Sequence, residues 1–287
     1  MAQMKIGWDS EITNYNSGTF LEFPVNPRLV DMSMDSQRNI KEIPYSRFHL
    51  LMDKGGLKPK SVVLNGYFYG SNKNTLINTL NKYIYGRDSN NSGLLRFYYT
   101  SNKFFYCFGQ GMKQTMVGER TNFTDYVANL VSPITFIYSD TLKSASMTIS
   151  DDSTHDFKTS TTSGDDFKND GSAPSHILEY TITNSSGGTI TKVEISDESG
   201  LEGNKITWEG NLLNGKVLKI YLFKVVDDIF KKLYYTNDGV FDGDRDFDGK
   251  EPPFIPAETT NPVFSVKLTG NAGNTTVNMK WRDAYWW

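Results

Sequence analysis

Apolar and polar residues alternate with a period of two over much of the first half of the chain. The alternation is clearest over residues 61–69, 94–99 and 134–138. Successive side chains of a β-strand point to opposite faces of its sheet, so this period predicts strands that are buried on one face. The first half is therefore expected to consist mainly of strands.

The same period returns in the second half, in seven short segments. They cover residues 176–183, 189–196, 205–212, 217–225, 232–236, 263–269 and 276–285. Turn-forming residues separate them, notably Asn184-Ser185-Ser186-Gly187-Gly188 and Asn214-Gly215. Many short strands with such turns favour a β-sandwich or a jelly roll.

One segment has helical spacing instead. The residues that share one face at this spacing are Leu76, Ile77, Leu80 and Ile84. Ser71 or Asn72 offers an N-cap, and Gly86 offers a left-handed stop. We predict a helix from Asn72 to Tyr85 that packs its apolar face on a β-sheet.

Composition changes over residues 140–175, which are rich in Ser, Thr, Asp and Gly. Such a stretch is typical of a linker or of exposed loops, here with at most a short strand at 145–149. The chain is therefore predicted to have a β-sandwich with one helix over residues 1–139, a linker over 140–175 and a second β-sandwich over 176–287.

Charge gives no indication of a nucleic-acid binder, because the formal net charge of the 287 residues is −3. The single cysteine, Cys107, lies in an apolar run and is predicted to be a small buried hydrophobe, which leaves no intrachain disulfide. No apolar stretch reaches the ~20 residues that a membrane helix needs, and Met1 to Trp8 lacks a signal-peptide pattern. We expect the protein to be made and folded in a reducing cytoplasm, without membrane insertion.

Candidate catalytic residues are few. The three histidines, His49, His155 and His176, are too scattered for a zinc site, and His49 is predicted to be a structural residue of an apolar strand. Glu194 and Glu209 lie on neighbouring predicted strands and offer a carboxylate pair for glycoside hydrolysis, although alternating surface glutamates are the ordinary explanation. No catalytic residue and no cofactor site is assigned.

The acidic loop Phe241–Pro253 is the one metal candidate. Asp244, Asp246 and Asp248 occupy the first, third and fifth positions of an EF-hand loop, and Gly249 the sixth. The twelfth position should be a glutamate but is Ile255, and nearby prolines exclude the exiting helix. Two interpretations stay open, a weak Ca²⁺ site and a solvated acidic loop, and no metal ligand is assigned.

Aromatic residues crowd into the end of the sequence, at Trp281, Tyr285, Trp286 and Trp287. Three interpretations are open: a last strand that closes its own sandwich, a contact with another protein, and a platform for sugar stacking.

Several segments of the first half resemble the first domain of the distal tail protein family of long-tailed bacteriophages. They are the run "NIKEIPYSRFHLLMDKGGLKPKSVVLNGYFYG", the predicted helix from Asn72 to Tyr85, "SGLLRFYYTSNKFFYCFGQG" and "VANLVSPITFIYSD", which ends in the Pro133 to Tyr138 segment. The shared order is a strand, a helix, paired aromatic strands and a final strand.

The second half is similar to the second domain of that family. It has an Asn-x-Gly-x-Ala opening at Asn169–Ala173, a long polar turn, a Leu-x-x-Gly-x-x-Leu step and a closing strand after Pro and Asn. Two features depart from the family pattern. Residues 256–261 replace a Pro-Gly-x-Asn turn, and the acidic loop over residues 237–251 is enlarged.

The resemblance implies a structural protein of the virion tail tip, assembled in the cytoplasm of the host bacterium. It implies a homo-oligomeric ring, usually a hexamer, formed by the first domain, and a galectin-like second domain that projects outward. Its implied partners are the tail tube protein, the tape measure protein, the tail-tip hub and receptor-binding proteins, while DNA passes through the ring without being recognised. We expect the subunit contact within residues 1–139, including the polar arm from Asp31 to Pro44.

Two alternative functions stay open beside this one, and the first is the glycoside hydrolase that Glu194 and Glu209 would form. Galectin-like domains can bind sugars, and Trp208, Tyr221 and Trp281 lie on predicted strands of the second domain. The second alternative is a carbohydrate-binding module used in host adsorption.

Overall fold

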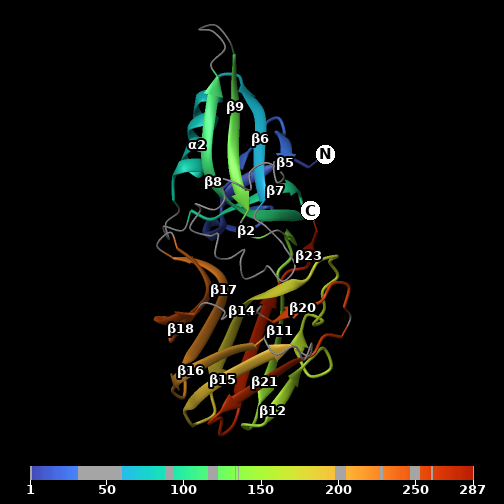
Figure 1. Cartoon of the computed structure of the whole chain (residues 1–287), viewed down its shortest axis with the longest axis vertical. Coiled ribbons are helices and arrows are strands. Elements are labelled where there is room, and N and C mark those ends of the chain that lie inside the picture. Colours follow the sequence, from blue (N-terminus) through green and yellow to red (C-terminus); the bar gives the residue numbers. More distant parts are fainter. Residues whose placement is uncertain are drawn as a thin grey trace. The chain divides into compact units, whose positions relative to one another are not determined.

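The computed structural model describes residues 2–31, 60–87, 93–115, 122–132, 134, 136–197, 205–226, 229–245, 253–259 and 261–286. The chain divides into two compact units, which are called unit 1 (1–140 with 225–229) and unit 2 (141–224 with 230–286). Both units are built mainly from antiparallel strands and are sandwich-like, which confirms the predicted fold class (Figure 1).

The sheet of unit 1 has the strand order β4-β1-β7-β8-β9-β6-β5, with β10 beside β8. Its strands are β1 (Lys5–Trp8), β4 (Leu21–Glu22), β5 (Arg28–Asp31), β6 (Lys60–Tyr69), β7 (Leu95–Thr100), β8 (Lys103–Thr115), β9 (Phe123–Ser132) and β10 (Ile137–Ser139). A one-turn helix η1 (Asp9–Glu11) follows β1 and leads into a small hairpin of β2 (Ile12–Asn14) and β3 (Ser17–Gly18).

The long strand β8 connects the two layers of unit 1. Its first part, up to Cys107, pairs with β7, and its second part, from Phe108, pairs with β9 with a register shift between Gly109 and Gly111. Gly109 is required there because an added Cβ atom would lie 2.1 Å from the backbone oxygen of Ile84 at the end of the helix. The bulge lets one continuous sheet turn around a single core.

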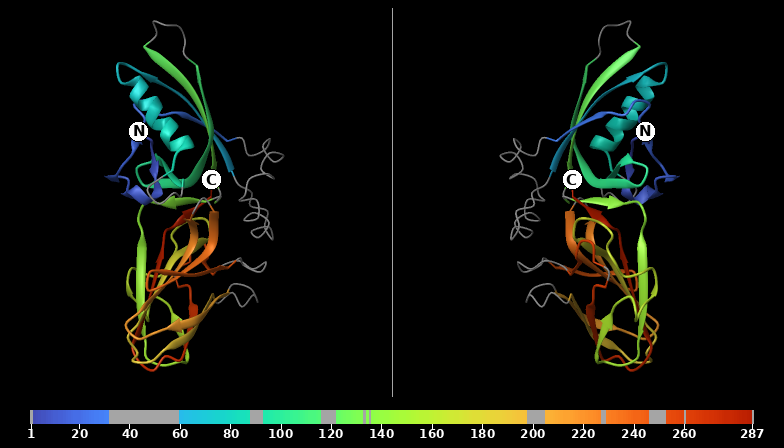
Figure 2. Two further views of the ribbon diagram at one scale, coloured as in Figure 1. Left: turned by 90° about the vertical axis from the view of Figure 1, so that its left-hand side faces the viewer. Right: turned by 90° about the vertical axis from the view of Figure 1, so that its right-hand side faces the viewer.

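The predicted helix is confirmed as α2 (Lys73–Tyr85), which buries Ile77, Leu80, Tyr83 and Ile84. It packs against β8, β9 and β6 on one side of the sheet (Figures 1 and 2). Gly86 differs from the prediction, because its φ of −92° is not left-handed. A glycine is needed at this position for a different reason: an added Cβ atom would lie 2.2 Å from the Lys82 backbone oxygen.

The core of unit 1 is rich in aromatic side chains. Its buried aromatic members include Phe23, which follows β4, and Trp8, Phe68, Phe97, Phe105 and Tyr126 of the sheet. Trp8 meets Tyr83 of α2 edge to face, with ring centroids 5.1 Å apart. Cys107 is buried in the same cluster, as predicted, and burial raises the pKa of its thiol.

Unit 2 contains two larger sheets. One has the order β13-β11-β22-β14-β17-β18-β19, with β20 beside β14, and the other has the order β12-β21-β15-β16. The strands of these two sheets are β11 (Lys143–Ile149), β12 (Thr154–Phe157), β13 (Ser163–Gly164), β14 (Ser175–Asn184), β15 (Ile190–Asp197), β16 (Lys205–Leu212), β17 (Val217–Val226), β18 (Ile229–Asn237), β19 (Val240–Arg245), β20 (Phe254–Ile255), β21 (Phe264–Thr269) and β22 (Thr275–Trp281). The short strand β23 (Ala284–Tyr285) lies outside these two sheets.

The structure differs from the predicted linker over residues 140–175. This stretch contributes β11, β12 and β13, and β11 pairs with β22 along its whole length. Ala145, Met147 and Ile149 of β11 point inward and are buried, whereas the intervening Ser and Thr side chains point outward. Many of the Ser, Thr, Asp and Gly residues of this stretch therefore lie on the outward faces of strands or in the turns between the strands.

The Asn-x-Gly-x-Ala opening holds the closing segments of unit 2 together. The Asn169 side-chain amide donates to the backbone oxygens of Ala173 (2.7 Å), Ile255 (3.3 Å) and Pro256 (3.3 Å). Its side-chain oxygen accepts from the backbone N–H groups of Gly171 and Ala284. A Cβ atom at Gly171 would lie 1.9 Å from the backbone oxygen of Ala284, so the motif is a packing requirement.

The Leu-x-x-Gly-x-x-Leu step carries the chain from one sheet of unit 2 to the other. Leu212 ends β16 and Leu218 begins the buried row of β17, and both side chains are fully buried. Gly215 between them has a φ of +78°, which favours glycine.

Among the described residues, no helix is long and apolar enough to cross a membrane.

Candidate functional site

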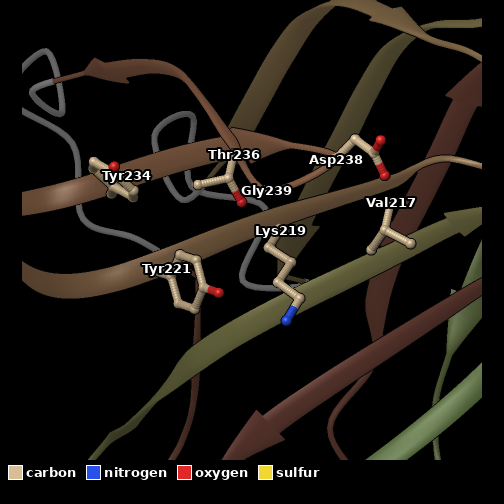
Figure 3. Close-up of a pocket in the computed structure, with 7 residues that line it drawn as sticks. All are labelled: Val217, Lys219, Tyr221, Tyr234, Thr236, Asp238 and Gly239. Atoms are coloured by element: carbon tan, nitrogen blue, oxygen red, sulfur yellow. The ribbon is translucent and has the colours of Figure 1, made fainter. Parts of the chain in front are cut away.

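An open cleft lies on the outer face of the β17–β18 sheet of unit 2. It has a volume of about 500 Å³ and is lined by Val217, Lys219, Tyr221, Tyr234, Thr236, Asp238 and Gly239 (Figure 3). The alternation of side chains explains this lining. Leu218, Ile220 and Leu222 of β17 and Tyr235 of β18 point into the core, so their neighbours point outward.

Three aromatic rings form a row across β17, β18 and β19, in which Tyr221 and Tyr234 line the cleft and Phe241 lies next to Tyr234. Tyr221 of β17 and Tyr234 of β18 have ring centroids 6.3 Å apart, and Tyr234 stacks on Phe241 of β19 at 5.2 Å. Phe241 is 54% exposed. We call Tyr221, Tyr234 and Phe241 the aromatic row.

A tight turn closes one end of the cleft. Asp238 and Gly239 connect β18 to β19 with positive φ values of 51° and 81°, as in a two-residue hairpin. The Asp238 carboxylate accepts from the Lys216 ammonium at 2.6 Å, and its backbone N–H donates to the Val217 backbone oxygen at 2.7 Å. The turn is therefore held both by the side chain of Asp238 and by its backbone N–H.

Charged and hydroxyl groups border the aromatic row on its other side. Glu179 and Thr181 of β14 pair with Tyr221 and Lys219, respectively. Glu179 accepts hydrogen bonds from Lys280 and Thr181, each at 2.9 Å. Burial raises the pKa of Glu179, but these hydrogen bonds outweigh it and hold the pKa below its usual value, so the carboxylate is ionised at neutral pH.

Two of the three predicted sugar-stacking residues are buried. Trp208 is 3% exposed and donates its indole N–H to the Asp242 carboxylate at 2.7 Å. Trp281 is fully buried and donates to the backbone oxygen of Lys168 at 2.8 Å. Of the set Trp208, Tyr221 and Trp281, the structure places only Tyr221 at the cleft.

The candidate carboxylate pair lies among lysines. Glu194 on β15 forms an ion pair with Lys205 and lies 3.2 Å from the Lys192 ammonium, which is also 3.8 Å from Glu209 on β16. The hydrogen bond from Lys205 is the main cause that lowers the pKa of Glu194. A glycosidase needs a general acid with a raised pKa, so this environment does not support that role.

His155, near the start of β12, meets Asp151 and Ser153 of the preceding turn, but without the geometry of a catalytic triad. Its Nε2 atom contacts both the Asp151 carboxylate (2.8 Å) and the Ser153 hydroxyl (3.2 Å), whereas a triad needs two different ring nitrogens. A hydrogen bond from Ser153 lowers the pKa of Asp151 to about 2. His176 is buried in unit 2, and His49 lies outside the described residues.

The acidic loop is described only at its ends. Asp244 lies on β19, whereas Asp246, Asp248 and Gly249 lie outside the described residues. Ile255, at the twelfth position of the failed EF-hand pattern, is fully buried in β20. The described part of the chain contains no group of three or more metal-ligating side chains, and the weak Ca²⁺ site stays a hypothesis.

The aromatic residues at the end of the sequence have different environments. Trp281 belongs to the core of unit 2 and packs edge to face on Phe167, with ring centroids 5.2 Å apart. Trp286 is 47% exposed, and Trp287 lies outside the described residues. Trp281 thus fits a last strand that closes its own sandwich.

Unit 1 offers a different kind of surface, made of strand edges. β6 pairs with β9 over its whole length, but β5 covers only residues 62–65 on its other side. β8 pairs with β7 only over residues 103–107. Within the described residues, the edges of 66–69 on β6 and of 109–115 on β8 therefore have no strand beside them, and they lie on opposite sides of β9.

A tyrosine side chain covers part of the β8 edge. The Tyr85 hydroxyl accepts from the Met112 backbone N–H at 2.6 Å and donates to the Met112 backbone oxygen at 3.1 Å. Both backbone groups of Met112 therefore point away from β9. Because a strand repeats every two residues, the N–H of Gln114 points to the same edge.

Three exposed aromatic residues lie at the end of β6 and the start of β9. The Tyr67 ring is 6.3 Å from Tyr69 and 5.8 Å from Phe123, measured between centroids, and all three side chains are exposed. A cluster of this kind on an outer sheet face marks a surface for contact with another molecule.

Sequence reasoning did not find the aromatic row as a unit. Tyr234 lies in a predicted strand, but the sequence gives it no function. Phe241 is the first residue of the predicted acidic loop. The sequence does contain a signal for this row. The pair Asp238-Gly239 predicts a hairpin turn, and a strand that follows this turn would include Phe241. The Tyr85 contact with β8 has no counterpart in the sequence pattern.

Comparisons with known proteins give structural similarity only. No family model matches the chain, and no curated protein matches it. The crystal structure of SPP1 Dit, described as a paradigm of the hub adsorption apparatus in phages that infect Gram-positive bacteria, aligns over 98% of each chain with a TM-score of 0.45 and 10% identity. Chains of the phage P2 baseplate in its activated conformation align over 97% of each chain, with TM-scores of 0.36 and 0.35 and identities of 10% and 11% for the Ca and Sr forms, respectively.

Proposed function

We propose that this protein is a structural component of a bacteriophage tail tip that assembles into a homo-oligomeric ring through unit 1. The observation that carries the proposal is the pair of open strand edges on opposite sides of β9. A strand edge offers a row of backbone donors and acceptors that pairs readily with another strand. Two such edges on opposite sides of one body suit head-to-tail contact between copies, which produces a ring when the rotation closes.

The sequence resemblance supports the same function. The described parts of the quoted segments of the first half lie on α2, β6, β7, β8, β9 and β10, which include the elements that form and flank the open edges. The resemblance to distal tail proteins implies a hexamer that continues the tail tube. The contact is proposed to lie within residues 1–139, and the arm from Asp31 to Pro44 is part of the proposal, although residues 32–44 lie outside the described part.

The proposed partners follow from that position in the virion. They are the tail tube and tape measure proteins, the tail-tip hub and the receptor-binding components. Unit 2 is proposed to be the galectin-like body that projects from the ring. The formal net charge of −3 agrees with a channel that lets DNA pass without gripping its phosphates.

The proposal is tested by blocking one strand edge without disturbing the fold. In the variant Gln114→Pro, the residue loses a backbone N–H that points to the open edge, so the pairing with β9 is kept. We expect this variant to remain folded and to lose the ring in negative-stain images, whereas Gln114→Ala keeps both.

A second variant checks the geometry of this edge. In Lys113→Pro, the lost N–H points toward β9, so we expect lower stability of unit 1 itself. Rings of equal abundance in Gln114→Pro and in the unchanged protein would contradict assembly through the edge of β8.

A further inference from the structure

We infer that the cleft along the aromatic row of unit 2 binds a neutral oligosaccharide built of pyranose units. This inference concerns unit 2 and does not depend on the formation of a ring by unit 1. It rests on the row itself, on the polar groups that border it, on the balance of charge and on the fixed geometry of the cleft.

The aromatic row supplies a platform for sugar rings. A pyranose has an apolar face of C–H groups that packs on an aromatic ring, while its hydroxyls point outward around the edge. Tyr221, Tyr234 and Phe241 come from three adjacent strands, with centroid separations of 6.3 and 5.2 Å. Because the rings follow one another across the sheet, they suit a chain of sugar units better than a single one.

Hydrogen-bonding groups lie where the hydroxyls of such a ligand would be. Lys219 and Thr236 line the cleft beside Tyr221 and Tyr234, and Asp238 closes its end. Figure 3 shows Lys219 and Tyr221 projecting from one strand and Tyr234 and Thr236 from the next. A cleft of about 500 Å³ lies within the usual size range of small-ligand sites.

The balance of charge favours a neutral ligand. Asp238 is paired with Lys216 at 2.6 Å, and Glu179 with Lys280 at 2.9 Å. Lys219 lies near the Glu179 carboxylate and lowers its pKa through its charge. Charges of both signs therefore offset each other around the row, so neither a polyanion nor a polycation has a complementary field.

The cleft is fixed before any ligand binds. Trp208 holds β19 through its 2.7 Å hydrogen bond to Asp242, next to Phe241. The Lys216–Asp238 ion pair and the backbone bond to Val217 hold the turn at the other end. Fixed rings lose little conformational freedom on binding, which favours affinity. Trp208 and Lys216 are thus positioning residues.

The test is calorimetric titration of the full chain with maltohexaose, cellohexaose, chitohexaose and β-1,4-galactohexaose. We expect at least one of them to bind with a Kd below about 1 mM. Tyr221→Ala should weaken that binding by about tenfold or more, because it removes one ring of the platform. Tyr221→Phe keeps the ring and should stay within about threefold.

Val240→Ala is the matched control, because Val240 is 70% exposed in the same hairpin and does not line the cleft. We expect its binding to be unchanged, and equal melting temperatures of all variants to show that unit 2 is folded. Failure of all four sugars to bind the unchanged chain, or equal binding by Tyr221→Ala, would overturn the inference. Binding of polygalacturonate in preference to every neutral sugar would overturn it as well.

Discussion

The two units build their candidate contact surfaces from different parts of the polypeptide. Unit 1 presents backbone, along the uncovered edges of β6 and β8, and unit 2 presents side chains, in the aromatic row of β17, β18 and β19. A backbone edge can pair with any strand of suitable length, whereas a row of rings selects its ligand by shape. The comparison suggests self-assembly for the first surface and recognition of a ligand for the second.

The units also differ in the contacts that hold their segments together. Unit 1 surrounds an aromatic core, while unit 2 connects its loops through buried asparagines, among them Asn169, Asn184 and Asn271. Asn184 donates to the backbone oxygens of Gly188 and Leu212, and Asn271 donates to those of Ile149 and Asp151. Substitutions at these connections should therefore destabilise unit 2 and leave unit 1 intact.

The largest effect is expected for Gly171→Ala. The new methyl group would lie 1.9 Å from the backbone oxygen of Ala284, so the backbone of the closing segment must move. We expect a loss of about 4 kcal/mol in the free energy of unfolding of unit 2, measured by urea denaturation.

Gly187→Ala is the matched control for this clash. Gly187 has a φ of +80° but no atom within 4 Å of an added Cβ. Its substitution should cost about 1 kcal/mol through backbone strain alone. Equal losses for the two variants would show that the packing around Gly171 is looser than described.

The next effect is a pH dependence caused by His176. Burial lowers the pKa of His176 to about 4 in the folded protein, against an ordinary value of 6.5. Between these values the unfolded chain binds a proton that the folded chain does not, so stability falls as the pH falls from 6.5 toward 4. We expect a loss of about 2 kcal/mol by pH 5 from this group.

Urea denaturation at pH 7 and pH 5 measures this loss, and His176→Phe should remove that part of the pH dependence. His155→Phe is the control, since His155 lies on β12, is only partly buried and is bonded to the exposed Asp151. An identical pH dependence in the His176→Phe variant and the unchanged protein would count against the assignment.

A smaller effect is expected for Asp242→Asn, which weakens the hydrogen bond from the Trp208 indole. The loss of a charged acceptor should cost about 1 kcal/mol and loosen β19. Hydrogen exchange should become faster over Val240–Arg245. Unchanged exchange there would mean that Trp208 does not position the strand that carries Phe241.

The smallest effect is expected for Tyr85→Phe. It leaves the N–H and backbone oxygen of Met112 to water at an exposed edge, so the cost to unit 1 should stay below about 1 kcal/mol. Thermal unfolding measures this cost. A loss well above that value would show that the Tyr85 contact supports the fold rather than merely covering the edge.

Much of the architecture was predictable because it depends on local periodicity. The predicted helix and the strand at 205–212 agree with α2 and β16 within a residue or two, since apolar spacing determines which face is buried. The segment 134–138 gave only the short strand Ile137–Ser139, although Ile134 and Phe136 are buried. Burial alone therefore does not distinguish a strand from an irregular core segment.

The candidate sites were harder to predict because they depend on which strands become neighbours. Trp208 and Trp281 were candidates for sugar stacking in the alternative function, but their strands turn these large rings into the core. Tyr221 and Tyr234 acquire their joint role only through the pairing of β17 with β18. Likewise, the composition of residues 140–175 suggested a linker with at most a short strand at 145–149, because the partner strand β22 of β11 is far away in the sequence.

The most direct test of the proposed function is the mass of the purified full-length protein in solution, measured by light scattering and native mass spectrometry. The account predicts a closed oligomer, six copies of the 32.5 kDa chain, that Gln114→Pro converts to monomers. A monomer at concentrations of tens of micromolar, with the same mass for the Gln114→Pro variant, would contradict it.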